Sequence, residues 1–510
     1  MQVVIGLDAG TTSTKAVTAG VDAQVRDVAG ADYPLLVPSP GRAELDPSRL
    51  QSAALQALTD VTTRAHERGD DVVGVVLCTA MHGLVPMTAD GAPIGPLMTW
   101  ADGRAAAQAA ALHRDGRARG LHARTGTPVH PMSPLTKLAW LAENDVELLQ
   151  RAPRWGGVKE LLVAALCDVG HVVDLSCASA TGMLDLDRRA WDDEALDVAG
   201  VRRDQLAEVL PATQVVGRLR DGVAALTGLS AGTPVVLGAS DGVLATLGTG
   251  ALRPGTGAVS IGTSAALRAV APRPGVDADG RLFCYALTDE HWIVGGAVNN
   301  GGAVVRWAAL ALAASFDQAP PVGEAADDLD ARLLEEAASV APGSDGLLCL
   351  PYLLGERAPW WQPGLSGAYV GLRRDHRRPQ LVRAAVEGVC QQLALVREAL
   401  DAAGCAVEQV HATGGAVASS LWTGVLAAAL DRPVRVADSP EGTGLGACLL
   451  GLHALGRLDD LVAASALVRV NAVIEPDPDA AATYRRRRPL VEEAVRGLTG
   501  VLTALDDEAP

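Results

Sequence analysis

The chain has 510 residues, 49% of them hydrophobic, and a formal net charge of −17 at pH 7. This length exceeds one ordinary hydrophobic core and suits two domains of similar size. The negative charge disfavours nucleic acids and anionic membranes as partners, because both would repel the chain.

The chain opens on a predicted strand, turn and strand. Val3–Leu7 is an apolar run typical of a buried strand, Asp8–Ser13 is a turn rich in Gly and Thr, and Lys15–Val21 returns as a strand, followed by a third over Gln24–Ala29. A Walker loop or a dinucleotide-binding fold would place a helix after the turn instead. Such a turn offers backbone N–H groups and hydroxyls to phosphate oxygens, although an ordinary hairpin has the same pattern.

Helical and apolar segments then alternate. The segments with helical spacing are Pro47–Arg68, Thr136–Leu149, Lys159–Cys167, Arg383–Ala403 and Leu421–Leu430. Apolar strands are predicted over Val72–Cys78 and over Pro234–Leu237, which runs into Gly238-Ala-Ser-Asp241. A second Gly-Thr-Ser turn, at residues 262–264, lies between predicted strands Ala258–Ile261 and Ala266–Val270. Two halves that each begin with such a hairpin indicate a duplicated α/β domain.

The eight cysteines are scattered, and no pair has CxxC spacing. This pattern predicts free thiols in a reducing cytoplasm. No cleavable leader and no apolar run of about 18 residues is found, so neither secretion nor a membrane span is expected. The tail after about residue 478 is predicted to be a helix with a frayed end, and its basic run Arg485–Arg488 a solvated helix face.

The two turns and four later motifs occur in an order that resembles the FGGY carbohydrate kinases of the actin-like ATPase superfamily. The later motifs are Gly355–Pro359, Arg383–Gly388, Thr413–Ala416 and Glu441–Ala447, and the resemblance runs from Val3 to about Leu455. It implies an α/β, two-domain actin-like ATPase (ribonuclease H-like) fold, each domain a mixed sheet flanked by helices, with a cleft between them. The expected parts are an N-terminal domain for sugar and phosphate (1–246), a C-terminal nucleotide domain (254–455) and a helical extension (456–510).

Within that family, several segments are most similar to gluconokinases. They are Ala80–Gly83, Thr99–Arg104, Thr125–Pro134, Phe283–Ala286 and Gly296–Gly302. The resemblance implies ATP- and Mg²⁺-dependent phosphorylation of D-gluconate to 6-phosphogluconate. Xylulose or another sugar or polyol is the alternative within the family. A non-catalytic actin-like ATPase or a sugar sensor is the alternative of another class, and a homodimer is left open by analogy with relatives.

The resemblance also carries site residues onto this sequence. Asp241 corresponds to the general base that accepts the proton of the attacking hydroxyl during in-line γ-phosphoryl transfer, and Asp8, with Asp241, to the magnesium site. The substrate-binding set is Met81, His82, Trp100, Arg104, Met132 and Asp241. The phosphate- and nucleotide-binding set is Gly10, Thr11, Thr12, Ser13, Lys15, Gly262, Thr263, Gly302, Gly414, Gly415 and Ser419.

Plainer interpretations stay open for several of these residues. An Asp beside Gly often caps a helix, a lone His is often structural, and Arg104 could pair with Asp102 rather than reach substrate. Ala266 is small and would leave room for a six-carbon chain. The candidates for binding a substrate carboxylate are Arg104, Lys137, Asn299 and Asn300. Relatives often have Gly where Ala265 stands; if that position requires positive φ, alanine costs about 1 kcal/mol.

Overall fold

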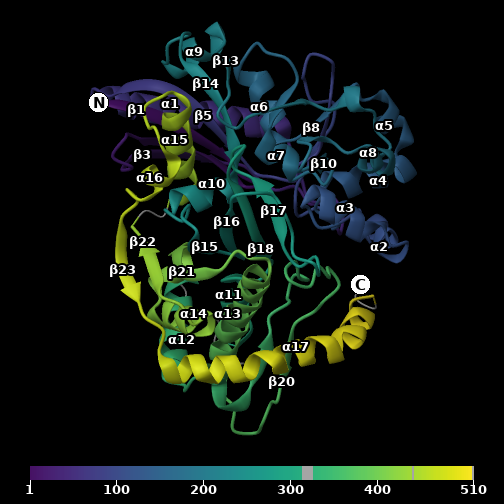
Figure 1. Ribbon diagram of the computed structural model, residues 1–510, viewed down its shortest axis with the longest axis vertical. Helices are drawn as coiled ribbons and strands as arrows, with labels where there is room; N and C mark the ends of the chain where they lie inside the picture. Colours follow the sequence, from purple (N-terminus) through teal and green to yellow (C-terminus); the bar gives the residue numbers. More distant parts are fainter. Residues whose placement is uncertain (313–325, 439–440, 508–510) are drawn as a thin grey trace.

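The computed structural model describes residues 1–312, 326–438 and 441–507. Two α/β domains lie one above the other along the longest axis (Figure 1). Between their sheets lie two helices, α10 (Asp241–Gly248) and α15 (Gly442–Ala454), which pack against each other. The predicted fold class is confirmed.

The N-terminal domain is built on a six-stranded mixed sheet in the order β13-β14-β5-β1-β2-β3. Its strands are β1 (Gln2–Ala9), β2 (Ser13–Ala19), β3 (Val25–Asp32), β5 (Asp71–Thr79), β13 (Val215–Arg218) and β14 (Pro234–Ser240). β1 and β14 both run parallel to β5, and their register places Asp8 and Ala239 opposite Cys78. Because parallel strands end at the same edge of a sheet, Asp8 and Asp241 come together there.

The C-terminal domain repeats this plan in a seven-stranded sheet, in the order β17-β18-β16-β15-β21-β22-β23. Its strands are β15 (Gly255–Ile261), β16 (Ala265–Ala271), β17 (Phe283–Ala286), β18 (Trp292–Val298), β21 (Val407–Thr413), β22 (Val434–Ala437) and β23 (Val470–Ile474). β15 pairs with β16 antiparallel and with β21 parallel. In the same way, β1 pairs with β2 antiparallel and with β5 parallel. The predicted duplication is therefore present in the strand order itself.

Helices cover both sheets, and short strands and helices form the connections, most of them in the long insertion between β5 and β14. In the N-terminal half they are β4 (Glu44–Leu45), α1 (Pro47–Glu67), β6 (Val85–Met87), β7 (Leu97–Met98), α2 (Ala106–Arg114), α3 (Arg117–Thr125), α4 (Pro134–Asn144), α5 (Val146–Arg151), β8 (Arg154–Gly156), α6 (Val158–Leu166), β9 (Val172–Asp174), α7 (Leu175–Ser179), β10 (Leu184–Asp185), β11 (Ala190–Trp191), α8 (Asp193–Ala199), η1 (Arg203–Gln205), β12 (Glu208–Leu210) and α9 (Asp221–Thr227). In the C-terminal half they are α11 (Ala303–Leu312), α12 (Ala326–Ala338), η2 (Ser344–Gly346), β19 (Leu348–Leu350), β20 (Ala368–Val370), α13 (Arg378–Ala402), η3 (Gly415–Ala418), α14 (Ser420–Leu430), α16 (Leu461–Ser465) and α17 (Pro478–Asp507).

Helix α15 belongs to the second half of the sequence but packs on the sheet of the first. Glycines allow this close approach: a Cβ on Gly444 would lie 2.4 Å from the Val17 side chain, and one on Gly446 would lie 2.0 Å from the Leu244 carbonyl oxygen in α10. Both distances are shorter than any real carbon contact, so side chains there would push the helices apart. The two domains are thus joined through a tight helix pair.

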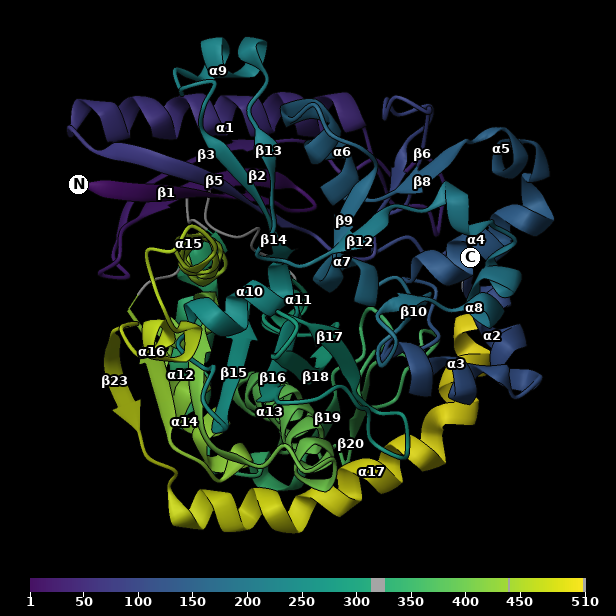
Figure 2. The same cartoon turned by 45° about the horizontal axis from the view of Figure 1, so that its top comes forward.

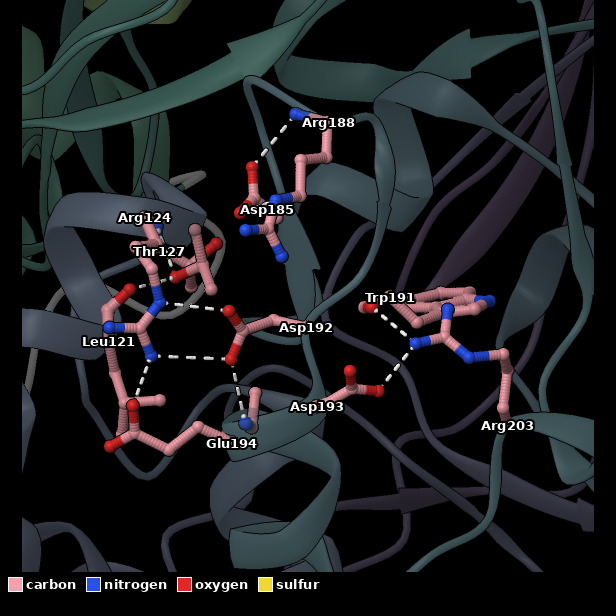
Figure 3. Close-up of polar contacts among 12 residues, drawn as sticks. Leu121, Arg124, Thr127, Asp185, Arg188, Trp191, Asp192, Asp193, Glu194 and Arg203 are labelled. Carbon is pink, nitrogen blue, oxygen red and sulfur yellow. Dashed lines mark hydrogen bonds and ion pairs between the residues drawn. The ribbon is translucent and has the colours of Figure 1, made fainter.

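Ion pairs hold together the lobe that α3 and α8 form (Figure 3). Arg124, near the end of α3, donates to Asp192 at 2.8 Å and to Glu194 at 2.6 Å. Asp192 also caps α8, because its side chain accepts the Ala195 N–H. Arg203 bonds Asp193 from the other side. This network fixes the end of α3, from which the chain runs into the loop that contains Met132.

Two sequence predictions about helices are wrong in detail. The helix expected over Thr136–Leu149 is two helices, because Asp145 has a non-helical backbone (φ −148°, ψ 61°) and caps α5 by accepting the Leu148 N–H. The basic run of the tail is not simply solvated. Arg485 pairs with Asp431, and Arg487 donates to the Leu347 carbonyl. Arg488, 5% exposed, donates to Gln391 and pairs with Glu398, so α17 is docked on the C-terminal domain.

The docked helix α17 crosses the whole C-terminal domain and ends near the N-terminal one (Figures 1 and 2). Thr503, close to its end, lines the same groove as Ala106 of α2. No helix among residues 1–312, 326–438 and 441–507 is long and apolar enough to cross a membrane.

Candidate active site

A cavity of about 180 Å³ lies where the two sheets face each other. From the N-terminal domain it is lined by Met81, His82, Trp100, Met132, Asp241, Gly242 and Val243. From the C-terminal domain it is lined by Ser260, Ser264, Ala265, Ala266, Arg268, Phe283, Tyr285, Ala297, Arg357 and Trp361. Of the residues predicted to bind substrate, the structure brings five together around this cavity; Arg104 is not among them.

Asp241 is the first residue of α10, and Ser240 is the N-cap residue of that helix. One carboxylate oxygen accepts the Gly242 N–H at 2.6 Å, while the side chain also faces the cavity. Burial raises the pKa of Asp241, whereas the Gly242 N–H and the cations Arg268 and Arg357 act in the opposite direction. A carboxylate whose pKa is raised toward neutrality is a better proton acceptor than an exposed one.

Asp8 lies beside Asp241 at the end of β1, where the Cys78 thiol donates to its carboxylate. Burial, followed by the charge of Asp241, raises the pKa of Asp8 to about 7. Two buried carboxylates that repel each other in this way are suited to a cation, which would favour the charged form of both. No group of three or more His, Cys, Asp or Glu side chains in the described part of the chain could enclose a metal. A divalent ion here would therefore need further oxygen ligands from phosphate or water.

The two predicted Gly-Thr turns reach this cavity from opposite domains. In the first, the Gly10 N–H bonds to the Ser13 carbonyl, and Thr11 accepts the indole N–H of Trp100 at 3.0 Å. In the second, Ser264 lines the cavity directly. Trp100 thus connects the first turn to a cavity that the second turn borders. Lys15 points elsewhere, since its ammonium pairs with Glu441 at 3.0 Å.

The glycines predicted to bind nucleotide gather around the second turn. The Gly302 N–H donates to the Gly262 carbonyl at 2.7 Å. Gly414 has φ +102°, and a Cβ there would lie 2.4 Å from the Ile261 carbonyl oxygen, so only glycine fits. Gly415 begins η3, and Ser419 is the N-cap residue of α14. These residues therefore form one backbone surface at the end of β15 and β21.

Residues 3–248 match the N-terminal domain, and residues 257–455 the C-terminal domain, of the FGGY family of carbohydrate kinases. The chain belongs to this family. It is 38% identical over 506 residues to the gluconokinase of Bacillus subtilis (strain 168), with 99% of this chain and 98% of that protein covered. The gluconate kinase of Lactobacillus acidophilus has a similar structure, with a TM-score of 0.89, 31% identity and 98% of each chain covered. A ligand-bound xylulose kinase from the same organism has the same TM-score and identity and covers 98% of this chain and 99% of that one.

As an FGGY carbohydrate kinase, the protein is a phosphotransferase that acts on an alcohol group and uses ATP. His82 forms part of the cavity wall. His82 adopts φ +64°, its Nδ1 bonds to the Ala180 carbonyl at 2.7 Å, and burial lowers its pKa to about 3, so the ring is neutral. Its Nε2 lies 3.5 Å from the Tyr285 hydroxyl. A neutral imidazole held on one nitrogen presents the other to the cavity.

The Lys137 ammonium of this kinase is fully buried and does not line the cavity. It donates to three backbone carbonyls: His82 at 2.7 Å, Thr99 at 2.6 Å and Met132 at 2.8 Å. Each of these carbonyls belongs to a different loop on the sugar side. Burial lowers the pKa of Lys137 to about 7. All three N–H donors of Lys137 are therefore used by loop carbonyls. None is left for a substrate carboxylate, so the prediction that Lys137 binds one is wrong.

Arg104 likewise does not reach the cavity. It donates to both carboxylate oxygens of Asp102, at 2.7 and 2.6 Å, and pairs with Glu44, while its guanidinium lies over the Trp140 ring. Arg104 therefore pairs with Asp102, which was the alternative to its reaching the substrate.

Asn299 and Asn300 also lie outside the cavity lining. The Asn299 side chain donates to the Leu354 carbonyl, and the Asn300 side chain donates to the Gly355 carbonyl and to Glu356. Both amides hold the loop before Arg357. Ala265 lies in β16 and is not among the residues with positive φ, so the anticipated backbone cost does not arise.

Two cavity residues, Arg268 and Arg357, were missed by the sequence analysis. Arg268 lies in β16, two residues beyond Ala266, and Arg357 follows the buried Glu356. In the described part of the chain, neither guanidinium has a carboxylate within 4.0 Å. The available signal was the alternation of β16, since residues two apart on a strand face the same side.

Proposed function

We propose that this FGGY kinase phosphorylates D-gluconate to 6-phosphogluconate, with ATP and Mg²⁺, in the cytoplasm. The observation that supports this substrate is the cavity beside Asp241, which contains two guanidinium groups with no carboxylate within 4.0 Å among the described residues. Asp241 and Glu356 offset these buried charges only from a longer distance, whereas a sugar acid supplies an anion in direct contact. The gluconokinase and gluconate kinase among its relatives support the same substrate.

In this proposal, each part of the site has one task. The turn over residues 10–13, with Gly262 and Thr263, binds the phosphates through backbone N–H groups and hydroxyls. Asp8, together with Asp241, holds Mg²⁺ through oxygen or water. The adenosine lies against Gly302, Gly414, Gly415 and Ser419, where glycine permits close approach and the N-terminus of α14 favours negative charge.

The chemistry that the chain itself supplies is positioning and one proton transfer. Met81, His82, Trp100 and Met132 hold the sugar so that the attacking hydroxyl faces Asp241. Asp241 accepts the hydroxyl proton as the oxygen attacks the γ-phosphorus and ADP leaves. Closure of residues 1–246 on residues 254–455 would exclude water, which would otherwise hydrolyse ATP. Alignment and charge neutralisation account for most of the rate in this kind of transfer.

A substrate screen with the purified full chain tests the proposal. ADP release is measured with D-gluconate, D-xylulose, glycerol and D-glucitol at saturating ATP and Mg²⁺. We expect D-gluconate to have the highest kcat/KM. A preference for D-xylulose would replace gluconate with the ketose that the similar xylulose kinase suggests. Nucleotide hydrolysis that no sugar stimulates would instead favour a non-catalytic actin-like ATPase.

A further inference from the structure

Strand β16 contributes a row of residues to the wall of the active-site cavity. Ser264, just before the strand, and Ala266 and Arg268 within it all line the cavity, as residues i, i+2 and i+4 on one face of a strand do; Ala265 lines it as well, beside the turn. At about 3.3 Å per residue, the Arg268 Cα lies about 13 Å along the strand from that of Ser264. The row therefore begins at the phosphate-side turn and ends at Arg268.

The surroundings of Arg268 leave most of its donors unused. Its one hydrogen bond among described residues is to the Ser260 hydroxyl, at 3.2 Å, although a guanidinium carries five N–H donors. Burial lowers its pKa to about 10, which still leaves it charged at neutral pH. The guanidinium packs against Gly242, where a Cβ would lie 3.0 Å from the Arg268 Nη2. Glycine next to Asp241 thus leaves the space that the guanidinium occupies.

Arg357, the other cation of the cavity, is held in the wall instead. Its guanidinium lies 5.1 Å from the centre of the Trp100 ring and donates to the Val298 carbonyl at 3.3 Å. Its neighbour Glu356 offsets part of its charge. A guanidinium that stacks on an aromatic ring is fixed in orientation. Arg357 is thus fixed against the ring, although its buried Nε has no hydrogen-bond partner among the described residues. Arg268 has no ring contact in the described part of the chain, and most of its in-plane N–H donors are free for a ligand.

We propose that Arg268 binds the carboxylate of the sugar-acid substrate and so determines that the enzyme prefers an acid to a neutral polyol. This inference rests on the proposed function. A guanidinium matches a carboxylate with two parallel hydrogen bonds, which sets direction as well as affinity. The Arg268 guanidinium lies beside Gly242 in the same cavity as Asp241, so a carboxylate bound to it keeps the sugar acid within that cavity.

The test compares Arg268→Met with Arg268→Lys and with the matched variant Arg357→Met, which removes the same charge from the same cavity. The readouts are kcat and KM for D-gluconate and the inhibition constant of D-glucitol, which has the same carbon chain without the carboxylate. For Arg268→Met we expect the KM for gluconate to rise on the order of 10²-fold, the scale for truncating one partner of a buried charge pair. The D-glucitol constant should stay within about threefold. Arg268→Lys should recover part of the loss, because it keeps the charge but not the planar fork.

Other outcomes overturn the inference. If the KM for gluconate changes less than about threefold in Arg268→Met, or rises no more than the D-glucitol constant, Arg268 does not read the carboxylate. The same holds if Arg357→Met alone shows the selective loss. Thermal melting and ATP binding of each variant establish that it is folded. If the wild-type enzyme itself turns over D-xylulose better than gluconate, the proposed function fails, independently of how the Arg268 variants behave.

Discussion

Replacing Lys137 by Met tests whether one buried ammonium holds the sugar side of the site together. Methionine has a similar length but donates no hydrogen bond, so the carbonyls of His82, Thr99 and Met132 lose their shared donor. The Thr99 carbonyl keeps the Asp102 N–H, at 3.2 Å. An unpaired buried acceptor costs about 1–3 kcal/mol, and the variant no longer buries a charge, so we expect a net destabilisation of about 2–4 kcal/mol.

The kinetic consequence should be confined to the sugar. Since the three carbonyls belong to the loops that contain His82, Trp100 and Met132, a displacement of about 1 Å there should lower kcat/KM for the sugar by about 10²-fold. The KM for ATP should stay within about twofold. Steady-state ADP release measures both. The control is Val163→Ala, a truncation in the buried core of α6 that loses stability without touching the loops. If Lys137→Met loses stability but keeps its kcat/KM for the sugar, the loops do not depend on Lys137.

The same variant has a pH signature. The pKa of Lys137 is about 7 in the folded protein and 10.5 ordinarily, so the unfolded chain binds more protons between these values. Stability contributed by this group therefore rises as pH increases from 7 to 10.5. Chemical denaturation across that window should show a steeper rise in wild type than in Lys137→Met. Equal slopes would mean that Lys137 stays protonated in the fold throughout this range.

Three further predictions follow from individual positions. Asp241→Asn should lower kcat at least 10²-fold, while calorimetry still detects ATP binding. The wild-type rate should rise with pH as Asp241 deprotonates, above its ordinary pKa because burial raises it, and the variant should lack that limb. Gly446→Ala should lower the free energy of unfolding in urea by about 3 kcal/mol, because its Cβ would lie 2.0 Å from a carbonyl oxygen of α10. The control Gly497→Ala, where a Cβ meets open space, should be neutral or stabilising. Arg488→Met should lower the free energy of unfolding by about 2–4 kcal/mol, because Arg488 is buried between Gln391 and Glu398. Arg486→Met should lower it by less than about 0.5 kcal/mol, because Arg486 bonds only to Thr483 among described residues. Equal losses in the two variants would refute the docking role of Arg488.

Local patterns were enough to predict the turns and strand ends that a single stretch of chain forms. The two Gly-Thr turns follow from glycine and threonine between apolar strands. The end of a strand before Asp241 also follows from the sequence, but the role of Asp241 as a base came from the family resemblance, because an Asp beside Gly often caps a helix. These features depend on backbone geometry over a few residues, which sequence specifies directly. The repeated order of hairpin, strand and helix likewise indicated two related domains before any contact was known.

The sequence alone could not decide which cation serves which purpose. Lys137 and Arg104 were predicted near a substrate carboxylate because they follow sugar-side motifs, but their donors are taken by carbonyls and carboxylates up to 60 residues away. Arg268 gave only the weak signal of its place two residues beyond Ala266, because an arginine on a strand usually faces water. Only the meeting of the two domains, which sets the Arg268 guanidinium against Gly242 of α10, brings it into the cavity. A charged side chain pairs with the groups that the fold brings within hydrogen-bond distance of it. Tertiary contacts between distant segments, rather than neighbours in the chain, determine which groups those are.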